Sequence, residues 1–510
     1  MPRMGSMSES RPEAAGLMPL SGNVQRTLLA LLVAVLVVLP LALHLPMYLD
    51  DHLRAVKGVS KWSRDGRPIA SLLWQIITLN APRLSLGSPL GLFLCVPAFI
   101  GSGFLLCRTL RNRQVWAPAL VVGLLFACPY FLENLSFSFD APLMVVAVMG
   151  NLAAASLLAE RPRGWSTLTV MSTAVLLLVL SLSLYQAANP AFWLPVGFAA
   201  FSLLPRRWGL FWQGVGCQGL SLLLYRWLVL LPGDLGGYAQ RRGALPPFDE
   251  LFGVIGFNLT NYAALLRDHW WNTPSGDVFA VFLIVTVPVI CLSIGRPWIT
   301  ALLLLPLLVF SYGMPLLLAE PVWAPRTFIG VGVNLACLAL LATREIRSDR
   351  SGLKRPVVLR SAPFRALVMV VVAAAFWTCL HIVYVYANAQ SAQQSLNRFV
   401  LSSLNRSLAH ADVDPRWLNE LYVEGTAPLS PIAQNSFRSV PYLRTLVHPL
   451  SHRWAGMETK QMLEERGFGR LRNRDDNIGP VRSLSSTALM DLSLQGRRLQ
   501  VTFKAPELGG

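Results

Sequence analysis

The sequence predicts an all-α polytopic membrane protein of about 11 transmembrane helices with a small C-terminal extracytoplasmic α+β domain. Of 510 residues, 54% are hydrophobic and only 14% are charged, against roughly 25% charged in soluble domains. The hydrophobic residues form blocks of roughly 20 residues with almost no interior charge, the length that crosses a bilayer. From residue 388 onward the charge density rises and the hydrophobic runs become short.

Charge and cysteine usage exclude other protein classes. The net charge is +17, but the basic residues lie in short loops between hydrophobic blocks rather than on one soluble face, so we expect no nucleic-acid partner. All seven cysteines lie in hydrophobic blocks. The sequence therefore predicts neither a disulfide framework nor a structural zinc site.

The hydrophobic blocks predict the membrane spans. The first block is longer than a signal-peptide core and lacks a small-x-small cleavage site, so we expect it to be retained. The sixth is short and opens with Asn189-Pro190, but without it the basic loop at 344–365 would change sides. The predicted spans are 26–47, 88–107, 115–132, 140–159, 166–185, 187–204, 208–231, 278–295, 298–318, 325–342 and 366–387.

Basic residues at alternate span ends set the orientation, because basic residues near a span resist translocation. We therefore predict that the N-terminal tail (1–25) is cytoplasmic, and that the transmembrane domain (26–387) has external loops at 48–87 and 232–277. The C-terminal domain (388–510) is then extracytoplasmic. The basic residues are Arg108, Arg111 and Arg113; Arg161 and Arg163; Arg206 and Arg207; Arg296; and seven residues within 344–365.

Two hydrophobic patterns lie outside the spans. In the C-terminal domain, residues at 396, 400, 404 and 408 repeat at helical spacing, while Leu499, Val501 and Phe503 alternate as in a strand. In the loop at 232–277, an amphipathic stretch from Leu251 to Leu266 predicts a helix. That helix either lies in the membrane interface or packs under the C-terminal domain.

Polar residues gather at the external ends of the spans. A carboxylate there can deprotonate a hydroxyl while a phosphate leaves, and a guanidinium can hold the phosphate through two oxygens. Each residue also has a structural interpretation: the acidic pair as a helix cap, Asp140 at a helix N-terminus, Trp62 as an interfacial aromatic residue, and Arg326 reaching the headgroups. The residues are Asp50, Asp51, Arg54, Trp62, Arg67, Glu133, Asp140, Tyr185, Gln186 and Arg326.

Three of these segments resemble a known family. The run from Tyr48 to Trp62, continued by Asp65-Gly-Arg67-Pro, resembles the opening signature of the bacterial glucosyltransferase type II family, the serotype-converting O-antigen glucosyltransferases. The run from Pro129 to Asp140 resembles that family's second block, and Leu184-Tyr185-Gln186-Ala its third. The resemblance extends over about residues 26–345 and does not include the C-terminal domain.

The resemblance implies a GT-C-like enzyme of the bacterial inner membrane, with a periplasmic C-terminal domain. Its expected partners are membrane lipid, a polyprenyl-phosphate-linked sugar and an extracytoplasmic glycan such as the O-antigen of lipopolysaccharide. The expected reaction is inverting transfer of a hexose, glucose in this family, with undecaprenyl phosphate as the leaving group.

The resemblance also implies site residues. It places the catalytic base at Asp50 or Asp51, and we expect Asp51 because Asp50 is closer to the end of the first span. We expect Arg67, with Arg54 and Arg326, to bind the donor phosphate. His52 stands where the family suggests a small residue. The remaining residues are expected to bind substrate: Trp62, Glu133, Asn134, Asp140, Tyr185 and Gln186.

Several alternatives stay open at this stage. No cofactor is required, although Asp50 and Asp51 could hold one Mg²⁺ or Mn²⁺ ion. The same fold could act on lipid A, a teichoic-type polymer or a protein. A lipid-linked-sugar flippase would place polar residues near the bilayer midplane rather than at one rim. A structural assembly protein would not explain why the polar residues gather. We expect the C-terminal domain to tune acceptor choice or assembly.

Overall fold

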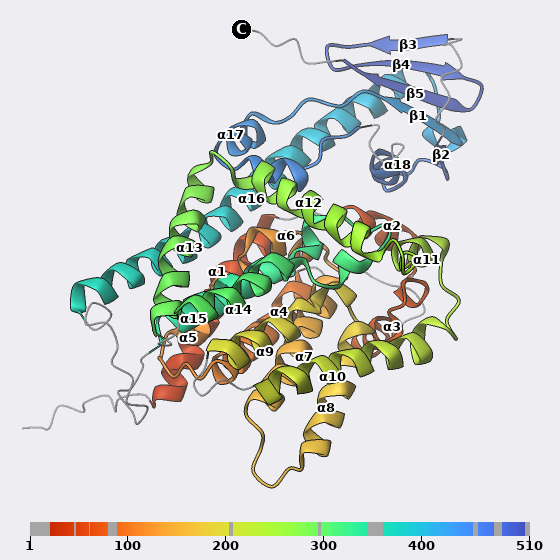
Figure 1. Ribbon diagram of the computed structural model, residues 1–510. Helices are drawn as coiled ribbons and strands as arrows, with labels where there is room; N and C mark the ends of the chain where they lie inside the picture. Colours follow the sequence, from red (N-terminus) through yellow and green to blue (C-terminus); the bar gives the residue numbers. More distant parts are fainter. Residues whose placement is uncertain are drawn as a thin grey trace, which may run out of the picture.

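The computed structural model describes residues 21–44, 47–60, 62–79, 89–202, 208–293, 297–344, 361–451, 457–473 and 482–504. The predicted N-terminal tail falls largely outside these residues, as do Arg206, Arg207, Arg296 and most of the basic group at 344–365. A bundle of helices forms the main body, and a small sheet lies beyond one end of it (Figure 1).

Each of the predicted spans contains a helix, because a continuous apolar block satisfies its backbone polar groups within one segment. Five of the described helices (α1, α4, α7, α13 and α16) are long and apolar enough to cross a membrane. Among the others, α8, α14 and α15 are shorter apolar helices. The protein is therefore an integral membrane protein. The helices are α1 Gly22–His44, α4 Leu90–Thr109, α5 Ala117–Phe126, α7 Ala141–Ala159, α8 Thr167–Leu182, α9 Pro190–Ser202, α10 Trp208–Tyr225, α13 Pro274–Ser293, α14 Pro297–Val309, α15 Ile329–Ala342 and α16 Ala362–His410.

The predicted span at 115–132 is not one continuous helix in the structure. It breaks between α5 and α6 (Pro129–Ser136), whose axes are bent by 74°. Pro129 lacks a backbone N–H and disfavours helical geometry at Cys128, which adopts φ −53° and ψ 132°. The bend turns α6 into the protein, where all eight of its residues are buried.

Further helices and short turns complete the membrane region. They are α2 Asp50–Lys57, α3 Pro68–Ile77, α11 Gly237–Arg242 and α12 Leu251–Trp270, with the short turns η1 Trp62–Asp65, η2 Gln186–Ala188, η3 Arg226–Leu230, η4 Phe310–Tyr312, η5 Met314–Leu317 and η6 Pro325–Thr327. The amphipathic helix predicted at 251–266 is confirmed as α12. Its two ends differ: Phe252 is 78% exposed, whereas the Trp270 ring stacks on Tyr442 of the C-terminal region at 5.5 Å.

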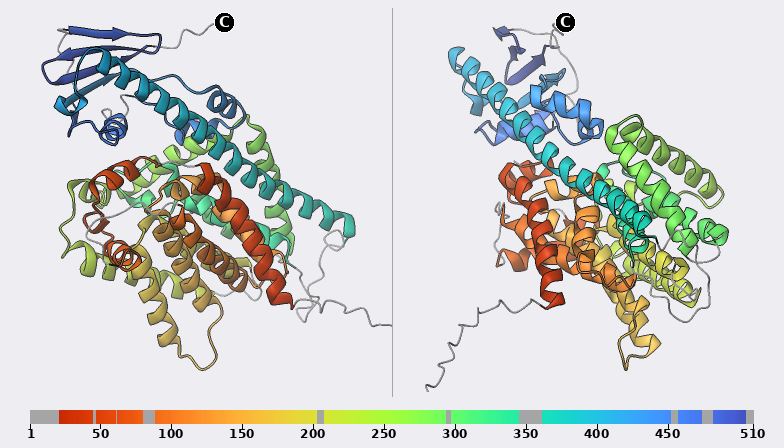
Figure 2. Two further views of the ribbon diagram at one scale, coloured as in Figure 1. Left: turned by 180° about the vertical axis from the view of Figure 1, so that it is seen from behind. Right: turned by 90° about the vertical axis from the view of Figure 1, so that its left-hand side faces the viewer.

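The small α+β unit predicted for the C-terminal region is confirmed. The long helix α16 runs from the bundle to the sheet (Figures 1 and 2), and Val400, Leu404 and Leu408 on one of its faces share a buried core with Leu499 and Val501. The strand order is β2-β1-β5-β4-β3, with β1 parallel to both neighbours and the other pairs antiparallel. The elements are β1 Glu420–Glu424, β2 Arg472–Asn473, β3 Arg482–Ser486, β4 Met490–Gln495 and β5 Arg498–Phe503, with α17 Pro431–Ser439, α18 Met457–Glu464, η8 Pro415–Trp417 and η9 Pro441–Thr445.

Two of the basic loops lie together. Arg108 and Arg111, at the end of α4, form ion pairs with Glu160, at the end of α7, at 3.3 and 3.8 Å. The loop between α7 and α8 is at the end of the molecule opposite the sheet (Figure 1). This grouping agrees with the assignment of both loops to one side of the membrane, while the side itself stays a prediction.

Candidate functional site

The two adjacent carboxylates begin α2, and they point in different directions. Acidic side chains are favourable in the first turn of a helix, and successive helical residues lie about 100° apart around its axis. Leu49, directly before them, has φ 42° and ψ −109°, an unusual conformation that turns the chain into α2. As a result Asp50 is exposed, whereas Asp51 is completely buried.

Asp51 connects α2 to the segment between α6 and α7. Its carboxylate accepts hydrogen bonds from the backbone N–H groups of Ser138 at 2.6 Å and Phe139 at 3.5 Å. Burial raises the pKa of Asp51 to about 7, against the opposing effect of the Ser138 hydrogen bond. Asp51, the residue expected to be the base, therefore holds α2 against the segment between α6 and α7.

The raised pKa of Asp51 predicts a pH-dependent stability. The folded protein holds this proton more tightly than the unfolded chain, so the stabilisation is complete below the ordinary pKa of 3.8 and is lost as the pH rises to about 7. Asp51→Asn cannot titrate. Between about pH 4 and 7, the melting temperature of the parent protein should therefore fall relative to that of Asp51→Asn. Above about pH 7, the two curves of melting temperature against pH should run parallel. Parallel curves over the whole range would contradict the shift.

Asp140 is the centre of a buried polar cluster. Its carboxylate pairs with Arg54, accepts a hydrogen bond from Trp62 Nε1 at 2.7 Å, and lies 3.6 Å from Arg67 Nη1. The Arg54 guanidinium stacks over the Trp62 ring at 5.1 Å. Burial lowers the pKa of Arg54, but the surrounding carboxylates, Asp140 first, together raise it above its ordinary value. Arg54 therefore stays charged.

Arg67 joins this cluster to the third sequence block. Its Nε donates to Gln186 Oε1 at 3.3 Å, and its guanidinium lies 5.1 Å from the centre of the Tyr185 ring. Gly66 makes the necessary turn with φ +74°, and a Cβ there would lie 2.8 Å from Tyr225 Oη. The Arg67 side chain is 22% exposed, so part of it faces the surface.

A second ion pair lies beside the first cluster. Arg326 Nη1 donates to Glu133 Oε1 at 2.5 Å, and the Arg326 backbone N–H donates to Glu133 Oε2 at 2.8 Å. The Arg326 carbonyl accepts from Tyr185 Oη at 2.9 Å and from Asn134 Nδ2 at 3.3 Å. The bend before α6 therefore brings Glu133 and Asn134 to the entrance of α15.

The structure brings the predicted site residues into one connected group, but at different depths. Asp50, Arg67, Gln186 and Arg326 keep exposed surface. The side chains beneath them are buried: Asp51, Arg54, Trp62, Glu133, Asn134, Asp140 and Tyr185. Trp62 is completely buried and stacks on Trp74 at 6.1 Å.

Sequence reasoning missed three contributors. Tyr225 accepts from Gln186 Nε2 at 2.7 Å and donates to the Gly66 carbonyl at 2.8 Å; a tyrosine inside an apolar block was the available signal. From the C-terminal region, Glu465 contacts His52 Nδ1 at 2.6 Å, and His448 Nε2 lies 3.4 Å from Tyr48 Oη. No local pattern connects residues that are about 400 positions apart.

Metal ligands are sparse in this group. Within the described ranges, no group of three or more His, Cys, Asp or Glu side chains lies close enough together to hold a metal ion. Asp50 and Asp51 diverge from each other, so the site is built mainly from ion pairs between carboxylates and guanidinium groups.

Comparison with known proteins gives two matches. A family model described as Glucosyl transferase GtrII matches residues 39–341, which include every candidate site residue. The chain is also 26% identical over 155 residues to the "Uncharacterized 55.3 kDa protein in gtrB 5'region" of Salmonella phage P22. That alignment covers 30% of this chain and 31% of the relative, so it spans less than a third of the relative's length. No solved structure matches the chain significantly.

Proposed function

Because the chain belongs to the Glucosyl transferase GtrII family, we propose that it transfers glucose from a polyprenyl-phosphate donor to an extracytoplasmic glycan such as O-antigen. Family membership implies a glycosyltransferase, and the donor, acceptor and mechanism are our proposal. The observation that supports it best is that one exposed carboxylate, Asp50, and two partly exposed arginines, Arg67 and Arg326, belong to the same connected group as the buried polar cluster.

We assign the base to Asp50 rather than Asp51. The Asp50 side chain has no hydrogen-bond or ion-pair partner among the residues that the structure describes. It also lies within electrostatic reach of Arg54, Asp65 and Arg326. Both Asp51 oxygens face backbone N–H groups in the interior. Asp50 is therefore the carboxylate that can reach an acceptor hydroxyl.

The proposed step is a single displacement. Asp50 removes the proton from the acceptor hydroxyl. At the same time the hydroxyl oxygen of the acceptor attacks the anomeric carbon from the face opposite the phosphate. The bond to the phosphate oxygen breaks, and polyprenyl phosphate leaves as an anion held by Arg67 and Arg326. The configuration at the anomeric carbon inverts. The phosphate leaves as a stable anion, so no separate general acid is needed.

The buried residues position these groups. Arg54 and Trp62 hold Asp140, Asp140 orients Arg67, and Glu133 orients Arg326. We propose that these buried residues fix the orientation of the partly exposed arginines without contacting the substrate themselves. We further propose that about 11 helices cross the inner membrane, with the N-terminal tail cytoplasmic and this rim and the region from 388 periplasmic.

The direct test uses purified protein with polyprenyl-phosphate glucose, with and without an O-antigen acceptor. We expect release of polyprenyl phosphate and appearance of glucose on the glycan. Movement of intact lipid-linked sugar across vesicles without release would instead indicate a flippase.

Replacement of Arg67 by lysine tests the proposed phosphate contact. Arg67→Lys keeps the charge but removes the bidentate contact with phosphate oxygens and the single hydrogen bond from Nε to Gln186, so the KM for donor should rise about tenfold. Arg64→Lys is the matched control, since Arg64 is exposed and pairs with exposed Asp234, at 3.2 Å. Unchanged donor KM and rate in Arg67→Lys would exclude the bidentate role.

A further inference from the structure

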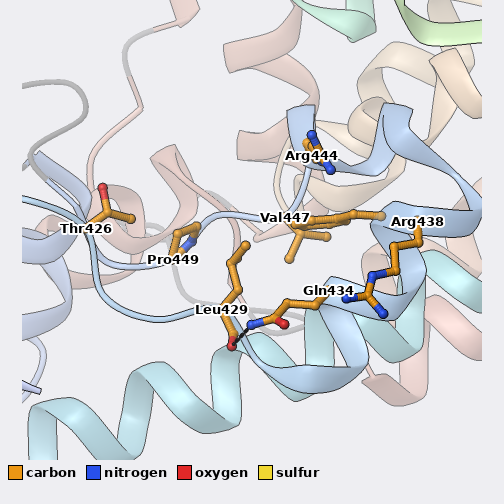
Figure 3. A pocket seen from close by; sticks show the side chains of 8 residues that line it. Thr426, Leu429, Gln434, Arg438, Arg444, Val447 and Pro449 are labelled. Carbon is orange, nitrogen blue, oxygen red and sulfur yellow. Dashed lines mark hydrogen bonds between the residues drawn. The ribbon is translucent and has the colours of Figure 1, made fainter. Parts of the chain in front are cut away.

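The C-terminal region contains a pocket of about 440 Å³, between α17, η9 and the loop before α17 (Figure 3). Its wall is apolar at Leu429, Val447 and Pro449, and its polar groups come from Gln434, Arg438 and Arg444. An apolar wall beside amide and guanidinium groups suits a sugar ring, because the C–H face of the ring packs on the wall while its hydroxyl groups form hydrogen bonds.

The pocket is cationic. Arg438 and Arg444 are both exposed, and neither has a carboxylate partner in the part of the chain that the structure describes. Elsewhere in the same region Arg416 is paired with Asp414 at 3.0 Å. No Asp or Glu is among the described residues that line the pocket. Two guanidinium groups among the lining residues, neither with a carboxylate partner in the described ranges, favour a ligand that carries an oxyanion.

The segment that lines the pocket contacts the segments that carry the candidate active site. Between Val447 and Pro449, His448 is buried and lies against Tyr48, with the ring centres 5.9 Å apart. Tyr48 precedes the proposed base by two residues. From η9, Tyr442 Oη donates to the Pro129 carbonyl at 2.9 Å, at the start of α6. A ligand in the pocket would therefore lie next to residues that contact the segment before Asp50 and the start of α6.

We propose that this pocket binds an acidic saccharide segment of the acceptor glycan. The proposal rests on the proposed function, and it names a recognition site outside residues 39–341, the part of the chain that the family model matches. The bound segment would hold the glycan close to the rim while a different sugar of the same chain reaches Asp50.

Binding to the full-length protein in detergent, measured by calorimetry without donor, tests the pocket. The probes are a short oligogalacturonate, a neutral oligosaccharide of equal length and inorganic phosphate. We expect the oligogalacturonate to bind most tightly, and Arg438→Gln and Arg444→Gln each to weaken it about tenfold. Arg470→Gln is the matched control, since Arg470 is exposed in the same region and outside the pocket.

Four results would overturn the proposal: no oligogalacturonate binding to the parent, equal binding of the neutral probe, equal binding of inorganic phosphate, or equal weakening by Arg470→Gln. Release of polyprenyl phosphate from the donor, followed with saturating O-antigen acceptor, separates this proposal from the proposed function. Normal release of polyprenyl phosphate without oligogalacturonate binding would refute only the proposed saccharide pocket. Normal oligogalacturonate binding without release of polyprenyl phosphate or transfer of glucose would refute only the proposed transferase activity.

Discussion

Asp50→Asn is expected to reduce the rate of glucose transfer by about 10²- to 10⁴-fold, the usual contribution of a general base. The amide cannot accept the proton of the acceptor hydroxyl, whereas the shape of the side chain is retained. Because Asp50 is exposed and has no partner among the described residues, donor binding and the melting temperature should stay close to those of the parent. Single-turnover transfer with saturating donor measures the effect.

Two variants serve as comparisons for Asp50→Asn. Asp249→Asn removes another exposed carboxylate, in the loop before α12, and should keep the parental rate. Asp51→Asn should change stability as described above and reduce the rate less than Asp50→Asn. If Asp51→Asn instead lost the larger factor while its stability was unchanged, Asp51 would be the base, as the sequence alone had favoured.

Asp140→Asn is expected to give the largest loss of stability, about 3–5 kcal/mol, because it leaves a buried guanidinium without its main counter-charge. Arg54 is 9% exposed, and its other carboxylate contact is Asp51 at 3.9 Å. The variant should also lower the rate, since Arg67 loses the carboxylate that orients it. Unfolding followed by circular dichroism in detergent measures the loss.

The double variant Arg54→Gln with Asp140→Asn tests the cause. If the loss comes from the uncompensated charge of Arg54, the double variant should be more stable than Asp140→Asn alone. Asp234→Asn is the control, since it breaks the exposed pair with Arg64 and should cost less than about 1 kcal/mol. A loss of that small size for Asp140→Asn would contradict the central role of Asp140.

The helices and the C-terminal unit could be predicted because their signals are local. An apolar block must form its hydrogen bonds within itself in lipid, and the leucine spacing in α16 and the alternation in β5 each describe one element. The break before α6 also had a local signal, because Pro129 disfavours a continuous helix. Our prediction of one span followed the hydrophobicity of the block instead. The predicted spans put the polar residues on one side of the membrane, which is why we expected them to gather, and the structure brings them into one group.

The sequence favoured Asp51 only through its distance from the end of the first span, and the different burial of Asp50 and Asp51 could not be predicted from it. The two residues are identical and adjacent, so composition, spacing and family resemblance apply equally to both. Their difference arises from the segment between α6 and α7, whose backbone N–H groups at 138 and 139 take up one carboxylate and leave the other in solvent.

By itself, the sequence determined that this chain is a helical membrane protein with polar residues at one rim and a mixed α+β C-terminal unit. Only the tertiary structure decided which of those residues are buried supports and which reach the surface. It also decided that the C-terminal region touches the site, through Glu465 on His52 and His448 beside Tyr48. The physical reason is that burial and ion pairing depend on which distant segments contact each other. Hydrophobic periodicity indicates only which face of a single segment is buried.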